Sequence, residues 1–386
     1  MSSGHIVMLL DNPFSSDFRV QKEIETLTKN GFKVSVVATN EDQSLPQEEI
    51  QNGVYITRTL ETEFSNPLRI SPAFLKRVTA IIAKLQPDYL HCHDHLMYHL
   101  GAHYKQQFPK TRLIYDSHEY LAGYPLYKSS IGWLNKVKGY IVWKYMRHLE
   151  NKHAHLLSAV ITASKPIASR LREQMKLSCP VIALTNIPEK PTALVTSNYF
   201  HAFFQLDSDQ LILVHTGNIY LTKHEFSRLA DSVAVLKNVS LVFVCSPDRF
   251  EKFKSIAQDH SNVFHHDYFS KEDMVPHLAA ADIGICHVPI TSQSFILTSA
   301  NRLYEYSLAG LPILSTKQQN CLELNEQFHH ICFYEHLGSE EFVDTLQQMI
   351  NDREKLSQNA AGIQEVVNWE IESKKLINLY QNLSVS

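Results

Sequence analysis

The sequence predicts an α/β protein built from two doubly wound, Rossmann-like domains. Short apolar runs alternate with amphipathic helical stretches along all 386 residues, and a polar, proline-containing linker interrupts the alternation near the middle. Runs such as 34–38 (Val-Ser-Val-Val-Ala) are β-branched and apolar, which is typical of strands buried on both faces of a parallel sheet. A chain of this length, 44% hydrophobic, is long enough for two cores.

The first domain is predicted to span residues 1–188. It opens with a strand at 4–10 and a helix at 17–30, which Gly31 ends. Short apolar runs predict its further strands, at 33–38, 54–60, 89–93, 112–116, 159–163 and 181–184.

The second domain is predicted at 189–367, after the linker 186–191, and an amphipathic helix within 368–386 closes the chain. Its strands are predicted at 211–215, 241–245, 263–269, 283–287, 312–315 and 331–334. Ligands of open parallel sheets bind beyond the carboxyl ends of the strands, so two such sheets predict a cleft between the domains.

Charge and cysteine usage exclude several classes of protein. The formal net charge of −4 gives no basic bias toward nucleic acid. The six cysteines form no C-x-x-C pair and indicate free thiols in a reducing compartment. No signal peptide and no apolar run of about 20 residues is evident, which favours a cytoplasmic protein. P-loop, G-x-G-x-x-G and Gly-x-Ser-x-Gly motifs are missing from the sequence.

A turn after the strand at 211–215 is the first candidate site. Gly217 permits close backbone approach to a ligand, and Lys223 lies six residues beyond it. A lysine there can neutralise a diphosphate. An ordinary strand end with a surface lysine is the alternative.

The second candidate is a helix predicted to begin with Thr298 or Ser299 as its cap and to end at Gly310. Its N-terminus favours an anion such as a diphosphate. Glu305, further along the helix, can accept bonds from a ribose diol. The alternative, a solvated glutamate, fits less well because apolar residues surround it.

Two polar clusters follow strands of the first domain. In the first, His118 can bind substrate hydroxyls while Asp116 or Glu119 orients it, and a capped turn is the alternative. The run 91–95 (His-Cys-His-Asp-His) invites a metal interpretation, but zinc needs further ligands, so strand-end packing is favoured.

The basic aromatic stretch 128–155 suits an anionic membrane surface, and a half-buried helix with a solvated basic face is the alternative.

In this order, the segments resemble glycosyltransferase family 4, a group of GT-B enzymes. The resemblance runs along nearly the whole chain. Its segments are 17–23 with 31–34, 87–94 (Pro-Asp-Tyr-Leu-His-Cys-His-Asp), 115–119 (Tyr-Asp-Ser-His-Glu), 160–164, 186–188, 278–285, 301–312 and 368–370 with 379–380.

The resemblance implies GT-B architecture and a retaining, metal-independent sugar transfer from a nucleotide diphosphate sugar, UDP- or GDP-linked, with no cofactor. The acceptor would be a glycan or a lipid-linked glycan in cell-surface polysaccharide assembly. The closing helix would cross back to the first domain. Catalytic roles fall to His118, Lys223 and Arg302, donor binding to Gly217, Asn218, Thr298, Ser299, Ala300, Asn301 and Glu305, and the acceptor side to Phe14, Arg19 and Glu119.

Two residues depart from the family pattern. Leu297 replaces the first glutamate of E-x7-E, and Asn218 stands where an arginine is usual. Arg302 is then expected to supply a second phosphate cation. The departures keep two alternatives open, a binding subunit without turnover and a GT-B-like nucleotide-sugar epimerase.

Overall fold

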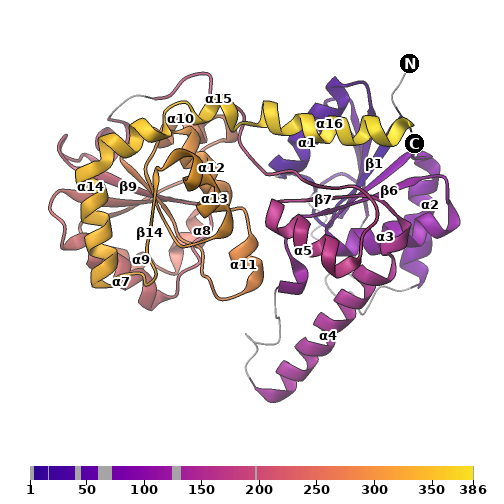
Figure 1. Ribbon diagram of the computed structural model, residues 1–386, viewed down its shortest axis with the longest axis horizontal. Helices are drawn as coiled ribbons and strands as arrows, with labels where there is room; N and C mark the ends of the chain where they lie inside the picture. Colours follow the sequence, from indigo (N-terminus) through magenta and orange to yellow (C-terminus); the bar gives the residue numbers. More distant parts are fainter. Residues whose placement is uncertain are drawn as a thin grey trace. The chain divides into compact units, whose positions relative to one another are not determined.

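The computed structural model describes residues 4–15, 17–39, 45–59, 72–123, 132–195 and 198–385. The chain divides into two compact units (Figure 1). Unit 1 comprises residues 1–185 and 373–386, and unit 2 comprises residues 186–372. Each unit is an α/β unit with its own parallel-dominated sheet, as the sequence predicts.

Unit 1 is built on a sheet whose described strands run in the order β3-β4-β2-β1-β5-β6-β7-β8. The central strand β1 is buried on both faces, as its apolar sequence requires. Its strands are β1 (His5–Leu9), β2 (Lys33–Thr39), β3 (Glu48–Gln51), β4 (Val54–Thr59), β5 (Tyr89–His93), β6 (Arg112–Ser117), β7 (Leu157–Thr162) and β8 (Val181–Ala183).

The strand β3 is the element that the sequence prediction missed. It pairs antiparallel with β4, whereas the other strand pairs of this sheet are parallel. Its residues are mostly polar because it lies at the sheet edge, so it lacks an apolar run. Asn52 and Gly53, both at positive φ, form the turn, and this Asn-Gly pair is the signal that could have revealed the hairpin.

The helices of unit 1 begin and end where local chemistry favours it. Asp17 caps α1 by accepting a hydrogen bond from the Val20 amide, and Ser164 caps α5 in the same way. The helices are α1 (Phe18–Lys29), α2 (Pro72–Leu85), α3 (Asp94–Gln107), α4 (Trp133–Lys152) and α5 (Lys165–Met175), with 3-10 turns at Leu121–Gly123 and Ala154–Leu156.

The sheet of unit 2 has the strand order β11-β10-β9-β12-β13-β14, and its strand pairs are parallel. The order reverses between β9 and β12, so a ligand is expected at the carboxyl ends of these two neighbouring strands. The strands are β9 (Leu211–Thr216), β10 (Val239–Val244), β11 (Val263–His266), β12 (Ile283–Cys286), β13 (Ile313–Ser315) and β14 (Ile331–Phe333).

Two apolar cores, one on each face, cover the sheet of unit 2. The helices of unit 2 are α6 (Tyr199–Phe204), α7 (Lys223–Ala234), α8 (Pro247–Glu251), α9 (Lys254–Gln258), α10 (Lys271–Leu278), α11 (Gln293–Leu297), α12 (Asn301–Leu308), α13 (Gln319–Phe328), α14 (Glu340–Ala360) and α15 (Ile363–Val366).

The last helix, α16 (Trp369–Val385), returns the chain to unit 1, to which residues 373–386 belong. Tyr380 is fully buried there, and its hydroxyl pairs with His91 Nδ1 at 2.9 Å. Leu376 and Leu379 are buried beside it.

The cysteines are free thiols, as expected from their spacing. Within the described residues, no helix combines the length and the apolar character that crossing a bilayer requires.

Candidate functional site

In unit 2, the carboxyl end of β9 holds the candidate ribose carboxylate in place. The Thr216 hydroxyl donates to Glu305 Oε2 at 3.1 Å, and the Thr216 amide donates to the Tyr306 hydroxyl at 2.8 Å. Gly217 follows with a φ of 72°, which turns the chain at the switch point of the sheet. Glu305 is thus half-buried and fixed at the edge where a ligand is expected.

Arg302 lies buried beneath the same turn, and protein groups orient it. Its guanidinium donates to His215 Nε2 and to the Asn218 carbonyl. His215 accepts this bond as a neutral ring, since burial and the adjacent Arg302 charge hold its pKa well below the ordinary value. A cation in this position raises the local potential at the carboxyl end of β9 without being exposed itself.

The helix α12 starts later than the sequence predicts. Ala300 occupies the cap position, so the expected cap at Thr298 or Ser299 is wrong. Ser299 instead donates to the Tyr304 hydroxyl at 3.2 Å, and the Thr298 carbonyl accepts from the Asn320 side chain at 2.8 Å. The methyl group of Ala300 cannot accept a bond from the first-turn amides of α12, which leaves that task to other groups.

The remaining donor-side candidates lie near these groups in sequence. Asn301 opens α12, and its side-chain oxygen accepts from Asn186 at 3.2 Å. Lys223 is the exposed first residue of α7. Thr222 and Glu225 form a capping box around it, which fixes the start of that helix.

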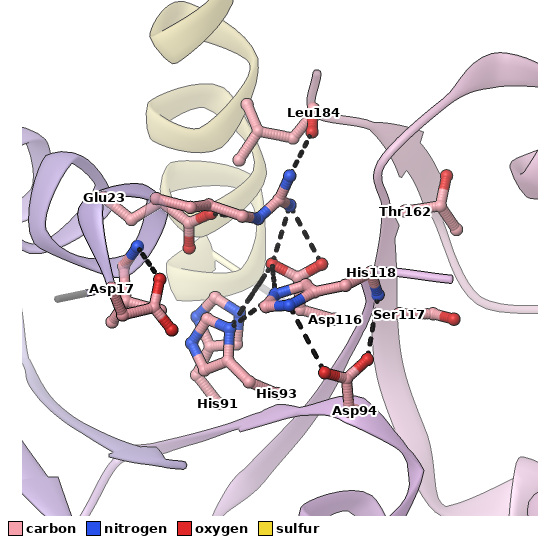
Figure 2. Close-up of polar contacts among 12 residues, drawn as sticks. Asp17, Glu23, His91, His93, Asp94, Asp116, Ser117, His118, Thr162 and Leu184 are labelled. Atoms are coloured by element: carbon pink, nitrogen blue, oxygen red, sulfur yellow. Dashed lines mark hydrogen bonds and ion pairs between the residues drawn. The ribbon is translucent and has the colours of Figure 1, made fainter. Parts of the chain in front are cut away.

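Unit 1 carries a buried ion-pair network at the ends of β5 and β6 (Figure 2). The Arg19 guanidinium donates to both carboxylate oxygens of Asp116 at 3.0 Å and to the Leu184 carbonyl at 2.9 Å. Arg19 Nε also lies 3.1 Å from Glu23 Oε1. Protein partners therefore engage the Arg19 side chain, and the acceptor contact predicted for it would need this network to open.

One arginine between two carboxylates balances one negative charge. Burial by itself would raise the pKa of Asp116. The charge of Arg19 outweighs burial and holds the pKa of Asp116 well below its ordinary value. Burial raises the pKa of Glu23 well above its ordinary value, and the charge of Asp116 adds to this despite Arg19. These opposite shifts favour the ionised form of Asp116 and the protonated form of Glu23, a distribution in which the charge of Arg19 is balanced.

His118 is the member of this cluster that solvent can reach. Its side chain is 24% exposed, whereas those of His91 and His93 are buried. Asp94, at a φ of 62°, faces it with Oδ2 3.3 Å from Nδ1, and His93 Nδ1 lies 3.1 Å from its Nε2 (Figure 2). Protein groups thus contact both ring nitrogens of His118, Asp94 at Nδ1 and His93 at Nε2.

The same cluster could be considered for a metal. Ligand atoms of Glu23, His91, His93 and Asp116 lie within 4.8 Å of one another. Arg19, however, already places its positive charge between the two carboxylates, and a cation there would have to displace it. These residues fit a charge-balanced support for His118 better than a metal centre.

The other predicted acceptor-side residues differ in exposure. Glu119 is exposed next to His118, whereas Phe14 is buried with its amide bonded to the Asn12 side chain at 2.8 Å. Of the basic aromatic stretch 128–155, residues 128–131 lie outside the described residues.

Asp11 is a candidate that the sequence prediction missed. It follows β1 at the point where the strand order of unit 1 reverses, which is the positional signal that could have identified it. Desolvation by neighbouring groups and the charge of Asp94 raise the pKa of Asp11 to about 6, although the residue is exposed at the surface. A carboxyl of this kind can exchange a proton near neutral pH.

Comparison with known proteins agrees with this description. The family model described as "Glycosyltransferase Family 4" matches residues 19–184. The matched residues all lie in unit 1, so the first unit is similar to this family in sequence. No curated protein sequence matches the chain.

Solved structures extend the likeness over both units. Sucrose-phosphate synthase from Thermosynechococcus elongatus is 15% identical with a TM-score of 0.76, and the match covers 98% of each chain. HepE from Anabaena, solved with UDP, is 13% identical with a TM-score of 0.67 over 99% of this chain and 100% of its own. WaaG, a glycosyltransferase involved in lipopolysaccharide biosynthesis, is 14% identical with a TM-score of 0.67 over 97% and 99%. The chain therefore has the GT-B glycosyltransferase fold, as predicted.

Proposed function

We propose that this protein is a retaining glycosyltransferase that uses a nucleotide diphosphate sugar and no metal ion. The acceptor is a glycan or a lipid-linked glycan in cell-surface polysaccharide assembly, and the reaction takes place in the cytoplasm. The observation that carries the proposal is the carboxyl end of β9, where Thr216 holds Glu305 and the following turn holds the buried Arg302 through the Asn218 carbonyl.

The nucleotide would bind to unit 2 at this edge. Glu305 can accept two hydrogen bonds from the ribose hydroxyls, because one carboxylate offers two oxygens. Structures of HepE with UDP and with UDP-glucose support a uridine nucleotide as the first candidate, with a guanosine nucleotide as the second.

The diphosphate would lie against the first turn of α12, with its charge balanced by Lys223 and Arg302. Amides of a helix start favour an anion, and a nearby cation adds to this. Donor-binding contacts from the turn at 217–218 and from residues 298–301 belong to the same proposal.

Sugar transfer breaks the bond between the anomeric carbon and the phosphate oxygen and forms a bond from that carbon to the acceptor hydroxyl oxygen. Negative charge develops on the leaving diphosphate, and Lys223 and Arg302 would stabilise it. The departing phosphate would take the acceptor proton, so front-face attack retains the anomeric configuration. His118, supported by Asp94, would hold the sugar in position.

Calorimetric titration with UDP, GDP and ADP tests the donor site. The protein is titrated in EDTA as wild type, as Glu305→Ala and as Glu326→Ala, whose exposed carboxylate lies on α13 away from this edge. We expect one nucleotide to bind to wild type and Glu326→Ala, and at least about tenfold more weakly to Glu305→Ala, since hydrogen bonds to a charged group contribute about 1.5–3 kcal/mol. Equal binding to all three proteins would refute the site.

One further measurement and one outcome of the titration separate the alternatives. NMR of the donor sugar incubated alone detects a nucleotide-sugar epimerase, which needs no acceptor. A protein that binds none of the three nucleotides would instead be a partner subunit, and Leu297 and Asn218 would then mark lost catalysis.

A further inference from the structure

The helix α4 of unit 1 has an inner and an outer face. Met146, Leu149 and Glu150 are buried, and the Trp143 indole donates to the Ala122 carbonyl at 3.2 Å. These contacts hold the second half of the helix against unit 1. The first half stands out from the neighbouring helices α3 and α5 (Figure 1).

The outer face of the first half is apolar. Trp133 is 72% exposed and Ile141 56%, with Leu134 and Val137 also exposed. At about 100° per residue these four side chains share one side of the helix, nearly opposite the buried set. Contiguous exposed apolar side chains of this size mark a binding surface.

Cations accompany this apolar stripe without an exposed acid. The sole acidic residue of α4 is Glu150, which is buried and accepts hydrogen bonds from Tyr115 and Gln174. Lys144 lies over the Tyr140 ring at 5.1 Å, and Arg147 lies over the Trp143 ring at 4.8 Å. The cations of α4 are Lys136, Lys138, Lys144, Arg147 and Lys152.

We propose that the outer face of α4 docks on a phospholipid bilayer that carries anionic headgroups. Apolar side chains would enter the boundary between headgroups and acyl chains, and the long lysine and arginine side chains would reach the lipid phosphates. The whole chain has a net charge of −4, yet α4 carries clustered cations. This local positive charge is complementary to an anionic membrane surface.

Other occupants fit this face less well. A second copy of α4 would bring the same cations against this surface, and like charges repel. Nucleic acid would match the cations but would leave Trp133 and Ile141 without an apolar environment.

Vesicle co-sedimentation tests the inference in the absence of donor and acceptor, so that its outcome is independent of the proposed transferase activity. The full chain is mixed with vesicles of 30% phosphatidylglycerol in phosphatidylcholine and with pure phosphatidylcholine. The variants are K136Q/K138Q/K144Q and W133S/I141S on α4, and K237Q/K252Q/K355Q on exposed lysines of unit 2 as the matched control.

We expect wild type and the unit 2 control to bind the anionic vesicles and to be released by 0.5 M salt. Each lysine near an anionic surface strengthens binding about fivefold, so the lysine variant of α4 should lose on the order of 100-fold. W133S/I141S should also bind more weakly at unchanged charge. All substituted side chains are exposed, and circular dichroism checks that the variants are folded.

Three outcomes would overturn the inference. Wild type fails to bind anionic vesicles, or the α4 variants bind as well as the unit 2 control. In the third, sedimentation without vesicles shows a dimer that W133S/I141S dissociates, which would assign this face to a second copy of the chain.

Discussion

Replacing Arg19 by methionine would expose how strongly unit 1 depends on its internal charge balance. Methionine keeps much of the apolar stem but removes the guanidinium that contacts Asp116, Glu23 and the Leu184 carbonyl. Because the raised pKa of Glu23 favours its protonated form, we expect this carboxyl to lose its contact with Arg19 at little cost. Asp116 is the group left uncompensated.

The expected cost follows from these contacts. Removing one partner of a buried ion pair costs about 3–5 kcal/mol. His91 Nε2 and His93 Nδ1 lie 3.6 and 3.7 Å from Asp116 Oδ2, and a proton taken up by either ring would supply part of the lost charge. We therefore expect the lower end, about 3 kcal/mol, which increases opening of unit 1 on the order of 100-fold.

Native-state hydrogen exchange by mass spectrometry measures this cost, with unit 2 as an internal reference. Amides of β1, β5 and β6 should exchange faster in Arg19→Met, and those of β9 and β10 should not change. Glu23→Gln copies the protonated acid and should alter unit 1 by less than about 1 kcal/mol. A change below 1 kcal/mol in Arg19→Met, or an equal loss in Glu23→Gln, would refute the charge assignment.

Three further perturbations concern unit 2. Lys223→Ala should lower sugar transfer on the order of 100-fold, with partial rescue by arginine, because one group stabilising the leaving diphosphate is lost; a wild-type rate contradicts its role. Gly284→Ala places a methyl group on the Tyr306 ring and should destabilise unit 2 in urea by about 1–3 kcal/mol and weaken nucleotide binding. Burial lowers the pKa of His287 and of His330 to about 4. The free energy of unfolding therefore has its full value above pH 6.5, where both rings are neutral in either state, and it decreases as the pH falls toward 4. Acidification from pH 7 to 5 should lower the free energy of unfolding by roughly 2 kcal/mol for each histidine, so His330→Asn should lose less stability than wild type. Equal losses in wild type and His330→Asn would contradict this.

Local sequence signals account for most of the fold. Apolar runs located the parallel strands because strands covered on both faces must be apolar. The edge strand β3 was missed because it is largely exposed and therefore has no apolar run. The Asn-Gly turn that follows it is the local signal for this strand. The start of α12 was misplaced because Ala300 caps it while Ser299 turns to Tyr304, a choice made by packing rather than propensity.

The site was less predictable because its contacts join distant residues. Arg302 meets His215 across 87 positions, and Arg19 meets Asp116 across 97. The sequence identifies these side chains as polar groups near strand ends. It does not reveal that Arg19 contacts both Asp116 and Glu23, and these contacts bury its guanidinium inside unit 1.

The return of α16 to unit 1 sets an order for folding during synthesis. The buried side chains of Tyr380 and Leu376 complete the core of unit 1, yet all of unit 2 is translated before them. At 5–20 residues per second, the ribosome needs roughly 10–40 s to make that intervening segment. The amino-terminal sheet must wait for this time with the site of α16 uncovered, whereas unit 2 is continuous in sequence and can fold while the chain still emerges.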